Sequence, residues 1–271
     1  MPKTNHFARN SLKLPLQAEP CLALTTASMS SHALDIVFDY TYDTSSFFDA
    51  SRKSLMDLAA NAFESRLSDN LTAINSGVGG SVDFQFSNPS GSGSITVTNG
   101  SVAANELRVY LGAEVMAGST LGTGGPGGYS ASGTQSFFDN LASRGQLGAL
   151  EPTATDFGPW GGVISFNSAA AWYFGTGTVG PGQSDFYSVA VHELGHVLGY
   201  GTADSWNAKV NSLTDTFTGA YSGTRALSSD EDHWIAGTSS DVNGLSQEAA
   251  MDPNITVGTR KYFTTLDYQG L

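Results

Sequence analysis

The segment 184–199, SDFYSVAVHELGHVLG, constrains the fold more than any other part of the 271-residue sequence. Ser184 can cap the start of a helix that begins at Ser184 or Asp185, and the acidic Asp185 suits its positive end. Gly199 can end the helix, because glycine readily adopts the left-handed conformation that follows a last helical turn. We therefore expect a helix over residues 185–199. Its buried stripe is expected to consist of Ala190, Leu194, Val197 and Leu198.

On that helix His192 and His196 are one turn apart, so their imidazoles leave the same face and can bind one metal ion. With a third protein ligand, such a site keeps one coordination position open to water. Zinc lowers the pKa of that water from 15.7 to about 7. Glu193 lies beside the pair but is offset around the helix, where it can act as a general base without being a ligand.

Two segments resemble a known family. HELGHVLGYG, residues 192–201, resembles the active-site helix of the metzincin clan of zinc endopeptidases, and its sequence is most similar to that of the matrixins. EAAMDP, residues 248–253, resembles the matrixin Met-turn, and by that match Met251 is the methionine that supports the metal from below. Residues 258–271 resemble the start of the helix that closes these domains.

The resemblance implies an α+β catalytic domain. Its twisted, mostly parallel sheet would pack on the active-site helix and a second long helix, and long glycine-rich and inserted loops would connect these elements. Substrate would lie antiparallel along an edge strand of the sheet, for which the strand 161–167 is the candidate. The alternative is that this strand lies in the interior of the sheet. We expect residues 34–271 to form this single domain.

The sequence departs from the family at the third metal ligand. The compact clan motif places it six residues after the second histidine, where this chain has Thr202, and a threonine hydroxyl is a poor zinc ligand. The leishmanolysin-like branch has an insertion at this point, and a shorter insertion over residues 201–232 would return His233 to the metal. Asp204 is the alternative third ligand. Three carboxylates flank His233 and could either supply a ligand oxygen or hydrogen-bond to its second nitrogen: Asp230, Glu231 and Asp232. Glu248, next to the Met-turn, is a further candidate ligand.

Hydrophobic periodicity and turn residues predict the remaining elements. Residues 118–133 contain seven glycines and a proline, which is typical of a flexible loop. After the helix at 185–199 we expect only loops and a last helix. The other expected elements are strands at 33–43, 81–86, 94–99, 106–115 and 161–167, an amphipathic helix at 51–71 and a short helix at 134–145.

The amino-acid composition limits which classes of partner and which cellular location are expected for this chain. The chain has 25 Asp and Glu residues against 12 Lys and Arg, a net charge of −13, which argues against nucleic acid or an anionic membrane. Cys21 is the single cysteine, so no internal disulfide can form. No apolar run approaches the roughly 20 residues of a membrane span. Low charge with abundant glycine is typical of secreted bacterial proteins, and residues 1–33 are either a signal peptide or a disordered tail.

These observations predict a secreted, monomeric zinc endopeptidase that acts on protein or peptide substrates. His192, His196 and His233 would bind zinc, Glu193 would be the general base and Met251 would support the site. Calcium sites are common in the clan, but no calcium motif is present in the sequence. The alternative hypothesis is a catalytically silent extracellular binding or adhesion module that keeps the zinc-protease fold.

Overall fold

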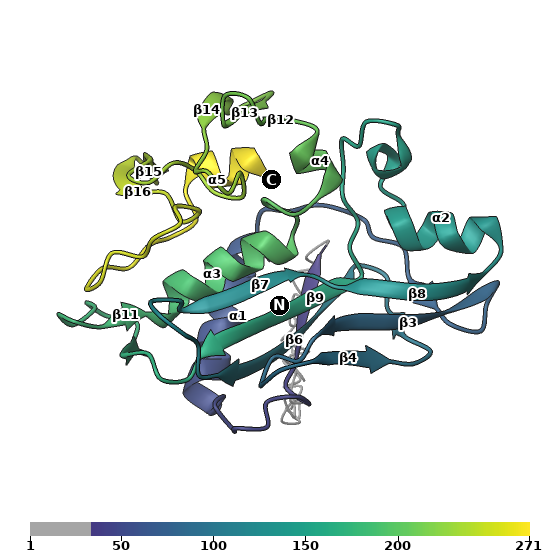
Figure 1. The fold of residues 1–271 in the computed structure, drawn as a ribbon, viewed down its shortest axis with the longest axis horizontal. Helices are drawn as coiled ribbons and strands as arrows, with labels where there is room; N and C mark the ends of the chain where they lie inside the picture. Colours follow the sequence, from purple (N-terminus) through teal and green to yellow (C-terminus); the bar gives the residue numbers. More distant parts are fainter. Residues whose placement is uncertain (1–33) are drawn as a thin grey trace, which may run out of the picture. The chain divides into compact units, whose positions relative to one another are not determined.

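A four-stranded sheet lies at the centre of the computed structural model, which describes residues 34–271 (Figure 1). The two interpretations of residues 1–33, and Cys21 with them, lie outside the described residues. The described residues belong to one compact unit. The first three strands in the sheet order are parallel and the fourth is antiparallel. In that order the strands are β1 (Asp35–Asp39), β6 (Glu106–Glu114), β9 (Gly161–Asn167) and β7 (Gly122–Pro126).

The central strands β6 and β9 are buried on both faces, which explains their nearly continuous apolar sequences. Leu111 and Ile164 face a core that the sheet shares with two helices. Tyr110 and Trp160 face a smaller core on the opposite side. The chain is therefore an α+β protein in which one face of the sheet carries helices and the other carries a second sheet.

The two helices are α1 (Ala50–Glu64) and α3 (Phe186–Val197), and they pack against each other. The helix predicted at 51–71 ends early, because Ser65, Asp69 and Asn70 favour turns over helix interiors. Leu71 is still buried, so the apolar spacing that suggested a longer helix reflects burial of the segment after α1.

The second sheet consists of three antiparallel strands, β4 (Ser94–Val97), β3 (Gly80–Ser87) and β8 (Gly128–Gly133). Phe84 on β3 stacks on Trp160, with ring centroids 4.2 Å apart. The helix α2 (Gln135–Ser143) packs beside β8. The remaining short elements before α3 are β2 (Ile74–Asn75), β5 (Ser101–Val102), the 3-10 helix η1 (Leu147–Leu150), β10 (Trp172–Tyr173) and β11 (Ser184–Asp185).

The glycine-rich segment is not a flexible loop, so that prediction is wrong. Residues 122–126 form β7 and residues 128–133 form β8. Glycine carries no side chain, so a strand of glycines shows no apolar alternation even when its backbone pairs fully with its neighbours. The prediction that the strand 161–167 is the sheet edge is wrong as well, because β9 lies between β6 and β7 and the edge is β7.

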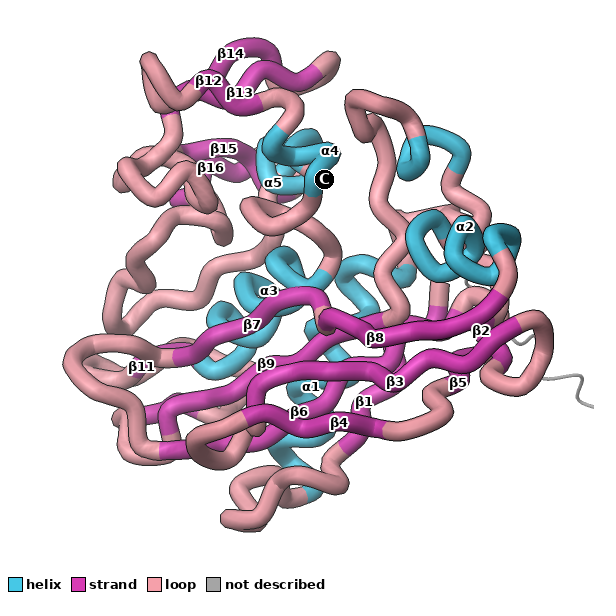
Figure 2. Tube along the Cα trace, turned by 45° about the vertical axis from the view of Figure 1, so that its right-hand side comes forward, coloured by secondary structure: helices cyan, strands magenta, loops and turns pink. Residues whose placement is uncertain are grey.

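The region after α3 contains more strands than the sequence suggested. Both views place two groups of short strands above α3, with the four-stranded sheet below it (Figures 1 and 2). The closing helix is also shorter than expected and covers only residues 265–270. The elements of this region are α4 (Asp204–Asn207), β12 (Val210–Asn211), β13 (Thr216–Gly219), β14 (Gly223–Ala226), β15 (Ser239–Val242), β16 (Leu245–Glu248) and α5 (Thr265–Gly270).

Among residues 34–271, no helix combines the length and the apolar character that crossing a membrane requires.

Candidate metal centre

The helix α3 is fixed at both ends. Asp185, not Ser184, is its N-cap, and the Asp185 carboxylate accepts a hydrogen bond from the Ser188 backbone at 3.0 Å. Arg260 donates two hydrogen bonds to the same buried carboxylate, at 2.9 and 2.6 Å. Gly199, with a φ of 110°, ends the helix in a conformation that other residues rarely adopt. All twelve residues of α3 are buried, so its histidines cannot move without disturbing the core.

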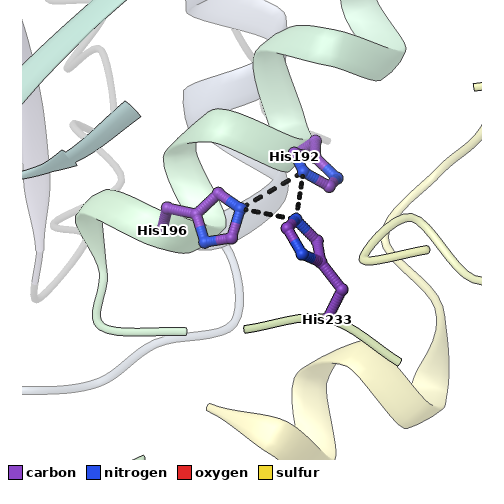
Figure 3. Close-up of side chains that lie close together, drawn as sticks. All are labelled: His192, His196 and His233. Carbon is purple, nitrogen blue, oxygen red and sulfur yellow. Dashed lines mark hydrogen bonds between the residues drawn. The ribbon is translucent and has the colours of Figure 1, made fainter. Parts of the chain in front are cut away.

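The structure brings His192, His196 and His233 together at one point (Figure 3). Their three Nε2 atoms form a triangle with sides of 3.1, 3.2 and 3.1 Å. Three nitrogen ligands bound at about 2.0–2.1 Å by one tetrahedral zinc ion are about 3.3 Å apart. The spacing therefore suits a single small ion.

The other ring nitrogens determine the tautomers. Nδ1 of His192 lies 2.7 Å from the carbonyl oxygen of Ala250, and Nδ1 of His196 lies 2.8 Å from that of Tyr200. Nδ1 of His233 lies 3.0 Å from a carboxylate oxygen of Asp230. All three partners are acceptors, so each neutral ring carries its proton on Nδ1.

Each Nε2 atom consequently presents a lone pair, and three lone pairs meet with no proton between them. Such an arrangement is repulsive unless a cation occupies the centre. Burial also lowers the pKa of His192 well below its ordinary value and lowers that of His196 to about 4. Both rings are therefore neutral near pH 7, which is the form that binds metals. A group of three histidines in this arrangement can hold a metal ion.

His233 reaches the site because the inserted segment has its own aromatic core. Trp206 stacks on Phe217 with centroids 4.2 Å apart, and Tyr200, which follows α3, contacts Trp206 at 4.1 Å. Trp234, the residue after His233, is fully buried against Tyr200 and Phe217. Burying these rings contributes several kilocalories per mole in all, which offsets part of the entropy lost in ordering the segment that carries His233.

Met251 packs directly against α3. A Cβ atom added at Gly195 would lie 2.8 Å from the Met251 sulfur, so the glycine inside HELGH allows this close approach. Asp267 of α5 holds the turn in place. Its carboxylate accepts hydrogen bonds from the backbone N–H groups of Ala250 and Met251 and from the Trp234 indole.

The residue Asp267 was missed by the sequence analysis. Thr264 and Asp267 form a capping box at the start of α5, and that T-x-x-D spacing is visible in the sequence. The spacing identifies a helix start, but it does not show that the same carboxylate bonds to the turn at Met251.

Glu193 lies between the histidines and the edge strand β7. Its carboxylate accepts a hydrogen bond from the backbone N–H of Gly124. A Cβ atom at Gly124 would lie 2.8 Å from the Glu193 carbonyl oxygen, so β7 can lie this close only because it is made of glycine. Burial raises the pKa of Glu193 to about 8 and the hydrogen bond opposes that rise. A nearby dication would lower this pKa, because opposite charge favours the carboxylate.

The structure places the rival ligands elsewhere. Asp204 is exposed at the start of α4 and does not belong to the group of possible metal ligands among the described residues. Glu248 forms an ion pair with Lys261 at 2.7 Å. Asp230 supports His233 from behind, as one of the flanking carboxylates was expected to do. The hydroxyl of Thr202 donates to the carbonyl oxygen of His196 at 2.8 Å and so satisfies the end of α3.

A cleft of about 780 Å³ opens onto the three histidines. The strand β7 and the segment before it form one wall, and the residues after Met251 form part of the other. A second cavity, of about 190 Å³, lies near Trp206 and Leu271, and none of the three histidines lines it. The candidate metal centre therefore lies at the base of the larger opening.

Comparisons with known proteins give no match, whether with protein-family models, with curated proteins or with solved structures. The function is therefore inferred from the residues of this chain and from their geometry.

Proposed function

We propose that this chain is a secreted zinc endopeptidase of metzincin type. One observation carries the proposal: three histidine Nε2 atoms converge within 3.2 Å of one another with every Nδ1 bonded to an acceptor, and Glu193 follows His192 directly. A structural zinc site has no use for such a buried carboxylate. The low charge content of the chain supports secretion.

The donor set favours zinc over harder ions. Neutral imidazole nitrogens suit zinc, whereas calcium and magnesium prefer oxygen ligands. Three protein ligands with one open position are typical of catalytic rather than structural zinc. When bound, zinc supplies a Lewis acid that polarises a carbonyl group and lowers the pKa of water to about 7.

The protein's own residues would then perform the remaining steps. Glu193 accepts a proton from the attacking water and passes it to the leaving amine. The Gly124 N–H group keeps the Glu193 carboxylate on the side of the edge strand. Nδ1 hydrogen bonds to Ala250, Tyr200 and Asp230 hold the three imidazoles in position for the metal.

The edge of the sheet supports a peptide as the substrate. Leu121 and Gly127, which flank β7, form backbone hydrogen bonds with Asn167 and Gly161 of β9. Alternate residues, Gly122 and Gly124, therefore direct their backbone groups to the other side, where the Gly124 N–H bonds to Glu193. That side borders the cleft, so an extended peptide can add to β7 as a further strand.

Glu193→Gln tests the proposal directly. We expect the variant to keep one zinc per chain and to lose about 10²- to 10⁴-fold in kcat toward a denatured protein substrate, because the general base is removed while the ligands remain. Zinc would be measured by mass spectrometry and cleavage by fluorescence of a labelled casein. Asp204→Asn is the matched control, and both zinc and activity should be retained in it.

The outcomes separate the two functional hypotheses. A wild-type protein that binds zinc but cleaves nothing would favour the silent binding module. A wild-type protein without zinc would contradict the metal centre itself.

A further inference from the structure

The charges of the cleft are all of one sign. Apart from the three histidines, the charged side chains among the described residues that line it are Glu193 and Asp232. No lysine or arginine is among those lining residues, and the whole chain carries a net charge of −13. Glu193 is the general base of the proposed mechanism. Asp232 is therefore the one acidic side chain among the described residues lining this cleft to which that mechanism gives no role.

Asp232 is held firmly in this wall. Its backbone N–H donates to Asp230 Oδ1 at 3.0 Å, and Asp230 is the residue whose other oxygen bonds to His233. Gly201, with a φ of 71°, lies against its backbone, and a Cβ there would be 2.6 Å from the Asp232 carbonyl oxygen. The backbone of Asp232 is therefore fixed relative to the candidate metal centre.

No group among residues 34–271 donates a hydrogen bond to the Asp232 carboxylate. Its charged neighbours are Asp230 and Glu231, which repel it, and His233, which attracts it when protonated. The two neighbouring acidic residues are engaged, since Asp230 accepts from His233 and Glu231 accepts from the Ser212 hydroxyl at 3.1 Å. A half-buried carboxylate without a donor favours a cationic ligand.

The direction of a bound peptide follows from the two glycines of β7, on the condition that the proposed function holds. A Cβ at Gly122 would lie 3.0 Å from side-chain atoms of both Val189 and Glu193, whereas the three nearest atoms to one at Gly124 all belong to Glu193, one turn after Val189. The strand β7 therefore runs in the same direction as α3. A peptide antiparallel to β7 has its amino side near the end of α3, where Thr202 and Asp232 line the cleft.

We propose that Asp232 selects substrates with a lysine or arginine on the amino side of the cleaved bond. The contact would be an ion pair with the Asp232 carboxylate, which accepts no hydrogen bond from the described residues, within the first few residues before the cleavage point. Acidic residues at the same positions would be disfavoured by Asp232 and by the negative charge of the chain.

The experiment uses the full chain loaded with zinc and a mixture of peptides of known sequence. Cleavage points are read by mass spectrometry for the wild type, for Asp232→Asn and for Glu231→Gln. Glu231→Gln is the matched control, because it removes the same charge one residue away from a side chain that does not line the cleft. Zinc content and melting temperature establish that each variant is folded.

For the wild type and Glu231→Gln we expect lysine and arginine to be enriched over acidic residues within three positions before the cut. Matched peptides with Lys or Gln at the enriched position should differ about fivefold in kcat/KM at low salt, and less at high salt. In Asp232→Asn the difference should disappear. Cleavage by the wild type without this enrichment, or enrichment that survives in Asp232→Asn, would overturn the inference while leaving the proposed function intact. Failure of the zinc-loaded wild type to cleave any peptide would contradict both.

Discussion

His192 and His196 lie on a helix whose residues are all buried, whereas His233 lies 37 residues beyond His196 on a segment without helix or strand. The helical pair is positioned by local geometry, because one turn of any α-helix sets the separation of residues i and i+4. His233 is positioned by contacts that are distant in sequence, chiefly the burial of Trp234. The two halves of one site therefore depend on different parts of the folding free energy.

The largest expected effect comes from removing a ligand from each half. We expect both His196→Ala and His233→Ala to lose stoichiometric zinc, because two imidazoles bind far more weakly than three. The variants should differ in hydrogen exchange. The segment 201–235 should exchange faster in His233→Ala, while α3 should stay protected in both variants. Equal loss of protection in α3 would show that the metal also holds the helix.

Trp234→Ala is expected to cost about 3–5 kcal/mol of unfolding free energy, as does the removal of other fully buried large aromatic side chains. The control is Leu141→Ala, in the small core around Trp160. Leu141→Ala should lower the unfolding free energy by about 2–5 kcal/mol and leave zinc affinity unchanged. Denaturant titration and zinc titration of both variants check this. Unchanged zinc affinity in Trp234→Ala would break the link between the inserted core and His233.

Asp230→Asn weakens the support of His233 without removing a ligand. The change takes away the charge behind Nδ1, and the loss of such a supporting group costs about 10- to 100-fold in metal affinity. Competition with a chelator of known affinity measures the change. Glu231→Gln, which neutralises the next residue, should stay within about twofold of the wild type.

Thr202→Val is expected to have the smallest effect. It removes the hydrogen bond from the Thr202 hydroxyl to the His196 carbonyl oxygen, which should cost about 0.5–1.5 kcal/mol of stability. Zinc affinity should be unchanged, because Thr202, at the position where the compact motif has its third ligand, bonds here to the end of α3 and not to a metal. A large loss of zinc from this variant would place Thr202 at the metal.

The sequence predicted those elements whose pattern is local. The strand 161–167 matches β9 residue for residue, and the helix expected at 134–145 corresponds to α2. The helix α3 was placed correctly, apart from its cap, because its apolar stripe and its final glycine lie within one short segment. Periodicity and capping are properties of neighbouring residues, so they can be read without the fold.

The rest depends on tertiary contacts that no local pattern encodes. The strand β7 could not be predicted because Gly122 and Gly124 are required by the nearness of α3, and a glycine run in the sequence resembles a loop. The position of His233 was inferred from a family resemblance and not from its neighbours. Asp267 was missed because its bonds to Ala250 and Met251 join residues 17 and 16 positions apart, respectively.

The bonds of Asp267 also bear on when the site can form. This carboxylate lies later in the sequence than every histidine of the site and later than Met251, yet it anchors the Met251 turn and the Trp234 indole. A ribosome adds residues in order, so α3 can fold while the turn and His233 still lack their anchor. The metal centre would be completed only after residue 267 has left the exit tunnel. Until then, the turn whose Ala250 carbonyl bonds to His192 would lack the carboxylate that anchors it.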